Sequence, residues 1–292
     1  MSFSVTVQPS GRHFTAEADE TLLSAGLRQG IGLPYGCKDG ACGSCKSKKI
    51  SGDLVMSEYQ AKALSDAEKE QGYVLTCRAT ATSDLVLESR QVVEEGAFPI
   101  RKMPVRVLSM AQASHDVMVI QLQLPANDSF HFRAGQYIDF LLRDGARRSY
   151  SMANAPHTLV AGTPVIELHI RHMPGGKFTD HVFGAMKEKE IQRIEGPQGS
   201  FILREDSDKP LVFLASGTGF APIRGLLQKR SYFQSRSEKL GPSFLIFGSR
   251  SSSEGLFHDE IVEFQEQGAL TEALMCYSRE VGVKKEYTQD KL

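Results

Sequence analysis

Four cysteines in the N-terminal part of the chain could together hold iron. Cys37, Cys42 and Cys45 lie in the segment Y-G-C-K-D-G-A-C-G-S-C, and Cys77 follows further along. With this C-x4-C-x2-C…C spacing, four thiolates can bind a [2Fe–2S] cluster, which carries single electrons. The loop must bring backbone N–H groups close to the cluster sulfurs, and its small residues allow such an approach: Gly36, Gly40, Ala41, Gly43 and Ser44. The cysteine pattern therefore predicts electron transfer.

Other uses of these cysteines fit the pattern less well. Zinc sites favour paired C-x2-C hooks, and the segment contains one such pair. A disulfide framework is typical of short secreted chains, whereas this chain has 292 residues, five cysteines and no secretory leader. The fifth cysteine, Cys276, lies in an apolar strand pattern and is expected to be a small core residue.

Two further segments have residue types that suit a flavin, although each is weak alone. In Arg148-Ser149-Tyr150-Ser151, alternation along a strand places a cation and a ring on one side, next to a hydroxyl. An exposed strand of mixed polarity is the alternative. The segment from Met173 to Thr179 contains Gly175 and Gly176 before a helical turn, which suits a pyrophosphate at a helix N-terminus. A simple Pro-Gly turn is equally compatible with it.

A third segment has the position of a nucleotide loop. Gly217, Thr218, Gly219 and Pro222 follow an apolar strand and open a helix, where α/β folds bind phosphates. The third glycine of the G-x-G-x-x-G pattern is absent, so the segment does not identify a cofactor by itself.

The elements that must position these residues fall into three stretches. Residues 1–93 predict a compact α+β domain with a hairpin, a short helix, the cysteine loop and a polar helix with Ser65 as its N-cap. After a linker at 94–103, residues 103–208 predict an antiparallel β-barrel of short strands. Residues 209–292 predict an α/β domain with parallel strands, of which 211–215 should be buried on both faces.

Composition excludes several classes of protein. The net charge of −1 does not indicate nucleic-acid binding, and no apolar run is long enough to span a bilayer. The N-terminus is an alternating strand pattern and not a signal peptide. We expect a cytoplasmic monomer that binds neither nucleic acid nor membrane.

The order of these motifs resembles the ferredoxin–NADP reductase superfamily, in particular its subgroup with an N-terminal plant-type [2Fe–2S] ferredoxin domain. The motifs occur in the order C-x4-C-x2-C…C, R-x-Y-S, G-G-x-x-T and G-T-G-x-A-P. The similarity covers the whole chain. The subgroup includes reductase components such as phenol hydroxylase reductase and CDP-6-deoxy-glucoseen reductase. The resemblance implies a β-grasp ferredoxin fold for the first domain, a flavin barrel for the second and a nucleotide domain for the third.

The resemblance also implies roles for single residues. Arg148 would hold the FAD pyrophosphate, Tyr150 would stack on the isoalloxazine and Ser151 would lie beside the reactive flavin N5; the last two are the catalytic candidates. The remaining cofactor-binding candidates are the pyrophosphate residues Gly175, Gly176 and Thr179, the nicotinamide-nucleotide residues Gly217, Thr218, Gly219 and Pro222, and Arg250 on the adenosine side.

Near the C-terminus, Ser278-Arg279 followed by Lys285-x-Tyr287 resembles the NADPH site of cytochrome P450 reductase-like flavoproteins. There these four residue types surround the 2′-phosphate, and two cations with two hydroxyls suit a dianion. A solvated charged loop is the alternative. The pattern favours NADPH over NADH.

The implied function is an NAD(P)H-dependent reductase that passes electrons through FAD and the cluster to a partner such as a multicomponent oxygenase. A non-enzymatic electron carrier and a flavin or ferric reductase with free acceptors are the alternatives. The superfamily's nucleotide domain has a further strand and helix, so we expect a truncated chain or one completed by a partner, with strand 211–215 at a sheet edge.

Overall fold

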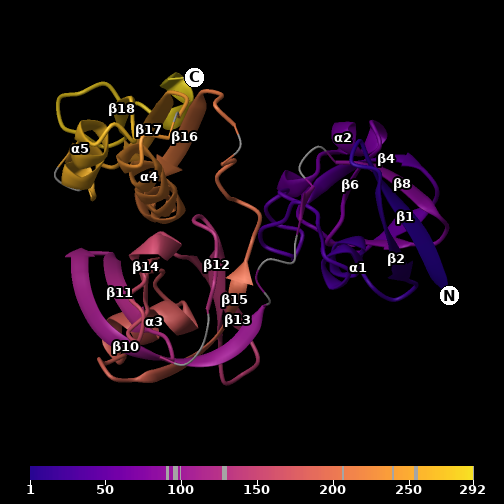
Figure 1. Ribbon diagram of the computed structural model, residues 1–292, viewed down its shortest axis with the longest axis horizontal. Helices are drawn as coiled ribbons and strands as arrows, with labels where there is room; N and C mark the ends of the chain where they lie inside the picture. The colour runs from indigo at the N-terminus through magenta and orange to yellow at the C-terminus, as the bar shows by residue number, and fades with distance from the viewer. Residues whose placement is uncertain are drawn as a thin grey trace. The chain divides into compact units, whose positions relative to one another are not determined.

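The computed structural model describes residues 1–89, 92–94, 98, 100–126, 130–205, 207–238, 240–252 and 256–291. The chain forms two compact units (Figure 1), one made of Met1–Pro99 with Gly199–Phe201 and the other of Ile100–Gln198 with Ile202–Leu292. We call the first the N-terminal unit. Within the second, residues 100–198 are the antiparallel half and residues 202–291 the parallel half.

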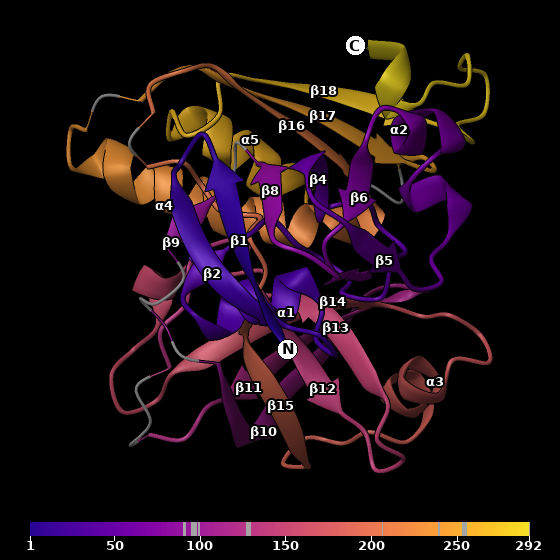
Figure 2. The same cartoon turned by 90° about the vertical axis from the view of Figure 1, so that its right-hand side faces the viewer.

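The N-terminal unit is a mixed sheet with short helices, in agreement with the α+β prediction. Its elements are β1 (Ser2–Gln8), β2 (Arg12–Glu17), α1 (Leu22–Arg28), β3 (Ile31–Gly32), β4 (Lys46–Ser51), β5 (Leu54–Met56), η1 (Ala61–Ala63), α2 (Asp66–Glu70), β6 (Tyr73–Leu75), β7 (Ala79–Ala81), β8 (Leu85–Glu88) and β9 (Val93–Glu94). The main sheet has the order β2-β1-β8-β4-β6, and β1 pairs with β8 in parallel (Figure 2).

Local sequence explains these elements. Alternation in β1 points Val5 and Val7 into the core, where both are fully buried. The predicted N-cap Ser65 is confirmed: its hydroxyl accepts from the Glu68 amide, and the Glu68 carboxylate accepts from the Ser65 amide in return, which is a capping box.

The antiparallel half contains β10 (Arg101–Ser114), β11 (Val117–Gln123), β12 (Tyr137–Leu141), β13 (Arg147–Ser151), η2 (Pro156–Thr158), β14 (Val165–Arg171), α3 (Lys177–Gly184) and β15 (Ile191–Gln198). Its six strands are ordered β13-β12-β15-β10-β11-β14. The predicted closed barrel is not formed by a continuous ladder, because β13 and β14 end the order. The described bridge between these ends is Met152 with Leu168.

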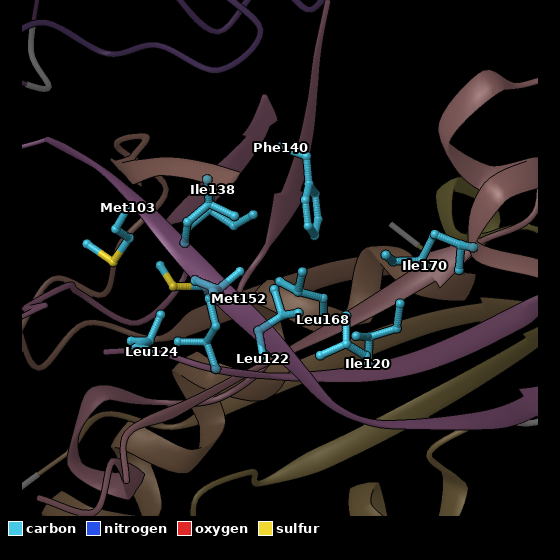
Figure 3. Close-up of a cluster of buried hydrophobic side chains, with 14 of the residues drawn as sticks. Met103, Ile120, Leu122, Leu124, Ile138, Phe140, Met152, Leu168 and Ile170 are labelled. Carbon is cyan, nitrogen blue, oxygen red and sulfur yellow. The ribbon is translucent and has the colours of Figure 1, made fainter. Parts of the chain in front are cut away.

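Apolar side chains from most of these strands meet in one cluster, which Figure 3 shows. The labelled residues are Met103, Ile120, Leu122, Leu124, Ile138, Phe140, Met152, Leu168 and Ile170. The predicted linker at 94–103 is only partly described, since residues 95–97 and 99 lie outside the described residues. Its last three residues belong to β10, where they pair with β15 and Met103 points into this cluster.

The parallel half contains β16 (Leu211–Ser216), η3 (Gly217–Gly219), α4 (Phe220–Ser235), β17 (Ser243–Ser249), α5 (His258–Glu266), β18 (Glu272–Tyr277) and η5 (Thr288–Lys291). The strands pair in parallel, as predicted, and their order β16-β17-β18 places strand 211–215 at an edge of this sheet. Both helices lie on one face of this sheet (Figure 2). The prediction that strand 211–215 is buried on both faces is therefore wrong: Val212 and Leu214 are 56% and 47% exposed.

The two halves of the second unit pack directly on each other. Helix α4 lies against residues 152–155, which directly follow β13. Arg224 donates to the Ala153 carbonyl at 3.0 Å and the Ala155 amide donates to Gln228 at 2.9 Å. Gly225 makes the approach possible, because a Cβ there would lie 3.3 Å from the Asn154 carbonyl oxygen. None of the described helices has the length and apolar composition needed to cross a bilayer.

Candidate functional site

The four cysteines come together as two pairs. Cys45 and Cys77 lie with their Sγ atoms 3.2 Å apart and both are buried. Cys37 and Cys42 face each other across the loop: the Cys37 amide donates to Cys42 Sγ at 3.4 Å and the Cys42 amide donates to Cys37 Sγ at 3.3 Å. Strand β6 supplies Cys77 because it ends at Leu75, two residues before the cysteine.

Further amides of the loop point at the sulfurs. The Ala41 amide donates to Cys37 Sγ at 3.3 Å, and the Ser44 amide donates to Cys42 Sγ at 3.4 Å. Gly43 is necessary for this path, because its φ is +75° and a Cβ would lie 2.9 Å from the Ala63 carbonyl oxygen. The backbone therefore provides the N–H donors that cluster sulfurs need.

The geometry suits a two-iron cluster better than a single ion. Among the described residues, no three His, Cys, Asp or Glu side chains gather around a point that would hold one metal. Two thiol pairs are what a [2Fe–2S] cluster requires, since each of its irons takes two of the four cysteines. The hydrogen bond between Cys45 and Cys77 lowers the pKa of Cys45 and raises that of Cys77, so the two thiols share one proton and Cys45 is the thiolate of this pair.

The strand β13 and helix α3 bring the predicted flavin residues into one region. The Tyr150 ring lies 5.5 Å from that of Phe178 on α3 and 5.9 Å from that of Phe140 on β12. Burial raises the pKa of Tyr150 to about 12, although the Arg148 charge opposes the shift, so the phenol is neutral. Arg148 is exposed and Ser151 is half-buried. A polar and charged surface therefore adjoins a partly buried ring.

The turn before α3 has an open backbone and a fully used hydroxyl. Gly175 has φ of +81° with nothing within 4 Å of an added Cβ, and Gly176 is the residue that caps the helix. The Thr179 hydroxyl donates to the Met173 carbonyl at 2.9 Å and accepts from the Met173 amide at 3.2 Å. Thr179 therefore shapes the turn. Gly176 has to be a glycine because a Cβ there would lie 2.7 Å from the Thr179 hydroxyl and 2.8 Å from the Met173 carbonyl oxygen, whereas the space beside Gly175 is open.

A cavity of about 260 Å³ lies at the carboxyl ends of the three parallel strands. This is the edge at which α/β sheets bind nucleotides. Five of the predicted residues line it: Gly217, Thr218, Arg250, Ser278 and Tyr287. Gly219 and Pro222 continue from the same loop, and Pro222 fits the first turn of α4, where no helical N–H is required.

Two cations that were predicted to bind the nucleotide do not line this cavity. Arg279 and Lys285 are absent from the lining of this cavity. The Arg279 amide donates to the Arg250 carbonyl at 2.7 Å, while its side chain is exposed. The Lys285 ammonium lies 4.9 Å from the centre of the Tyr287 ring, so it is near the cavity but outside it.

The sequence did not indicate three charged residues that line this cavity, two acids and one arginine. Asp116 and Arg171 line it from the antiparallel half, and Glu286 lines it from the segment before η5. No motif marks Asp116, which lies in the two-residue turn between β10 and β11. Gly248 lets the C-terminal segment close the cavity, because a Cβ there would lie 3.2 Å from the Thr288 methyl.

Two protein-family models match the chain: "2Fe-2S iron-sulfur cluster binding domain" at residues 5–82 and "Oxidoreductase FAD-binding domain" at residues 104–202. The CDP-6-deoxy-L-threo-D-glycero-4-hexulose-3-dehydrase reductase of Yersinia pseudotuberculosis is 40% identical over 78% of this chain and 67% of its own length. The reductase component of Mycolicibacterium smegmatis propane 2-monooxygenase is 32% identical over 90% of this chain and 74% of its own.

The same architecture is found in solved structures. The crystal structure of the Amycolatopsis cytochrome P450 reductase GcoB aligns with 99% of this chain and 85% of its own, with a TM-score of 0.71 and 29% identity. The ferredoxin reductase of carbazole 1,9a-dioxygenase aligns with 95% of this chain at a TM-score of 0.59 and 24% identity, which supports the fold alone.

Proposed function

Because this chain belongs to the iron–sulfur flavoprotein reductases of the ferredoxin–NADP reductase superfamily, we propose that it takes electrons from NADPH and passes them through FAD and a [2Fe–2S] cluster to a partner protein. The observation that carries this proposal is the arrangement of four thiols as two pairs within a loop that directs amides at the sulfurs.

The residues of each site fit the group that we assign to it. Cys37, Cys42, Cys45 and Cys77 would ligate the cluster. Arg148, Tyr150 and Ser151 would contact FAD. Gly175, which has open space beside it, and Gly176, which caps α3, would place the helix N-terminus at its pyrophosphate. When bound, FAD would supply the conversion of a two-electron hydride into single electrons, and a [2Fe–2S] cluster would supply one-electron transfer.

The chain's own contribution is to bind and position these groups. The Tyr150 phenol stays neutral and packed on Phe178, so it supplies a rigid ring for the flavin. Gly217 has φ of +52° and nothing within 4 Å of an added Cβ, which leaves room for a nucleotide over the end of β16. Helix α4 holds this loop against the residues that follow Ser151.

The identity of the coenzyme and of the acceptor belongs to this proposal. Arg250, Ser278 and Tyr287 in the cavity, with Lys285 beside it, support NADPH. The acceptor would be a protein, by analogy with relatives that are named as reductase components of a propane monooxygenase and of a hexulose dehydrase.

The test compares two acceptors in two cysteine variants. Wild-type protein should reduce both ferricyanide and cytochrome c with NADPH. Cys77→Ser should retain ferricyanide reduction, which needs the flavin alone, and lose most cytochrome c reduction. Cys276→Ala changes a buried cysteine outside the four and should retain both activities. If Cys77→Ser retained both activities, the cluster would be excluded from the electron path to cytochrome c.

A further inference from the structure

One carboxylate from the antiparallel half reaches into the nucleotide cavity of the parallel half. Asp116 Oδ2 accepts a hydrogen bond from Arg250 Nη2 at 2.8 Å and another from Arg171 Nε at 3.0 Å. Its Oδ1 accepts from the Ser114 hydroxyl at 3.1 Å. The same Arg250 that we assign to the nucleotide is therefore already engaged with an anion.

Asp116 is charged at neutral pH. Partial burial would raise the pKa of its carboxyl, but the hydrogen bonds from Ser114 and Arg250 and the nearby Arg171 charge outweigh burial and lower it. Its side chain is 14% exposed, so the charge is poorly screened by water. The other acid of the cavity, Glu286, lies 3.0 Å from the Lys291 ammonium.

A phosphate group and the Asp116 carboxylate would both bind the same side chain, Arg250. Arginine binds both through charge-assisted N–H···O bonds. A phosphate that approaches Arg250 meets repulsion from Asp116, and this repulsion increases with the charge of the ligand. Arg171 lies on β14 and contacts the same Oδ2 atom, so Asp116 keeps a cation at 3.0 Å when Arg250 turns away. Arg250 can therefore move to a phosphate without leaving the half-buried Asp116 carboxylate unpaired.

We propose that Asp116 is a built-in counter-ion that competes with nucleotide phosphates for Arg250, and that Arg171 takes over its charge when the nucleotide binds. The proposal rests on the assignment of this cavity to the pyridine nucleotide. In this proposal Asp116 sets the affinity for the coenzyme and makes that affinity depend on the charge of the phosphate. Asp116 does so without contacting the nicotinamide.

The first test measures binding of coenzyme fragments by calorimetry at low ionic strength, using the full chain. Asp116→Asn keeps the side-chain shape and an oxygen acceptor but removes the charge. It should bind 2′,5′-ADP roughly tenfold more tightly and 5′-AMP a few-fold more tightly, whereas adenosine binding should not change. Asp144→Asn is the matched control, since it removes an exposed carboxylate that pairs with Lys177 outside this cavity. It should alter none of these affinities.

A double-mutant cycle tests the role of Arg171. Arg171→Met should weaken 2′,5′-ADP binding, because among the described residues Asp116 Oδ2 then keeps Arg250 as its remaining arginine partner and holds it more tightly. The loss should be several-fold smaller in the Asp116→Asn background, where no carboxylate needs a partner. Equal losses in both backgrounds would overturn the exchange, as would weaker 2′,5′-ADP binding by Asp116→Asn, which would make Asp116 a support for Arg250.

This inference and the proposed function can fail separately. If Asp116→Asn tightens 2′,5′-ADP binding but the wild-type protein does not oxidise NADPH, the counter-ion is retained and the reductase assignment is lost. If NADPH is oxidised and Asp116→Asn leaves the affinity for 2′,5′-ADP unchanged, the reductase assignment is retained and the counter-ion is excluded.

Discussion

The cysteine loop and the cavity that we propose for the nucleotide are built in opposite ways. Three of the four thiols lie within nine consecutive residues, and the loop's own amides supply the donors to sulfur. The cavity instead collects residues from the β10–β11 turn, the end of β14, the ends of three parallel strands and the C-terminal segment. The first site depends on local backbone conformation, whereas the second depends on the packing of distant segments.

This contrast has consequences for what each site tolerates. A substitution in the cysteine loop acts through φ and close contact within a few residues. A substitution far from the cavity in sequence can still disturb it, because ion pairs hold its parts together: Arg224 with Glu260 at 2.6 Å and with Glu167 at 3.2 Å, and Asp116 with Arg250 at 2.8 Å.

The largest effect should come from a methyl group in the cysteine loop. Gly43→Ala places a Cβ at positive φ and against the Ala63 carbonyl, at a cost of about 3 kcal/mol in local strain. Most of the bound iron should be lost, as measured by the ratio of iron to protein. Gly11→Ala is the control: its φ of +69° carries similar backbone strain, but nothing lies within 4 Å of the new Cβ. If both variants keep their iron, the loop is not specified by its backbone.

An intermediate effect should follow from breaking the contact between the two halves of the second unit. Arg224→Met removes the partner of Glu260 and Glu167 and the bond to the Ala153 carbonyl, and should lower the free energy of unfolding by about 2 kcal/mol. Urea unfolding measures this change, and 2′,5′-ADP affinity should fall with it, while iron content should not. Arg236→Met removes an exposed cation and should change stability by less than about 0.5 kcal/mol.

The smallest effect concerns an exposed pair beside the cysteine loop. The Lys46 ammonium and the Ser65 amide hold the pKa of Glu68 at about 2, below its ordinary 4.5. The pair thus stabilises the fold above about pH 4.5, and this contribution disappears as pH falls towards 2. Glu68→Gln keeps an acceptor for Ser65 and should lower the melting temperature at pH 7 by roughly 1 °C. Near pH 2 the two proteins should melt alike; an equal difference at both pH values would assign the effect to something other than charge.

The sequence predicted those features whose interacting residues lie close together along the chain. The cysteine spacing predicted the cluster site because three of its four candidate ligands lie within nine residues. Ser65 was predicted as a cap because it directly precedes a polar helix, and the structure adds its reciprocal bond with Glu68. The predicted roles of Gly217, Thr218, Arg250, Ser278 and Tyr287 remain predictions, although the fold brings these residues to one cavity.

What sequence could not provide depends on tertiary contact. Asp116 and Arg250 are 134 positions apart, and no pattern near either residue indicates that they pair. Thr179 remains a predicted pyrophosphate residue, and sequence did not indicate that its hydroxyl also bonds the amide and carbonyl of Met173, six residues away. The apolar run at 211–215 indicated burial on both faces, whereas the described helices cover one face only.

If the proposed function holds, electrons from NADPH reach the cluster in this chain. Electron paramagnetic resonance of the anaerobic protein tests it directly, because a [2Fe–2S] cluster becomes paramagnetic when it accepts one electron. Addition of NADPH should produce the signal of the reduced cluster in wild-type protein and in Cys276→Ala, but not in Cys77→Ser. A signal that appears with dithionite and is absent with NADPH would contradict the account.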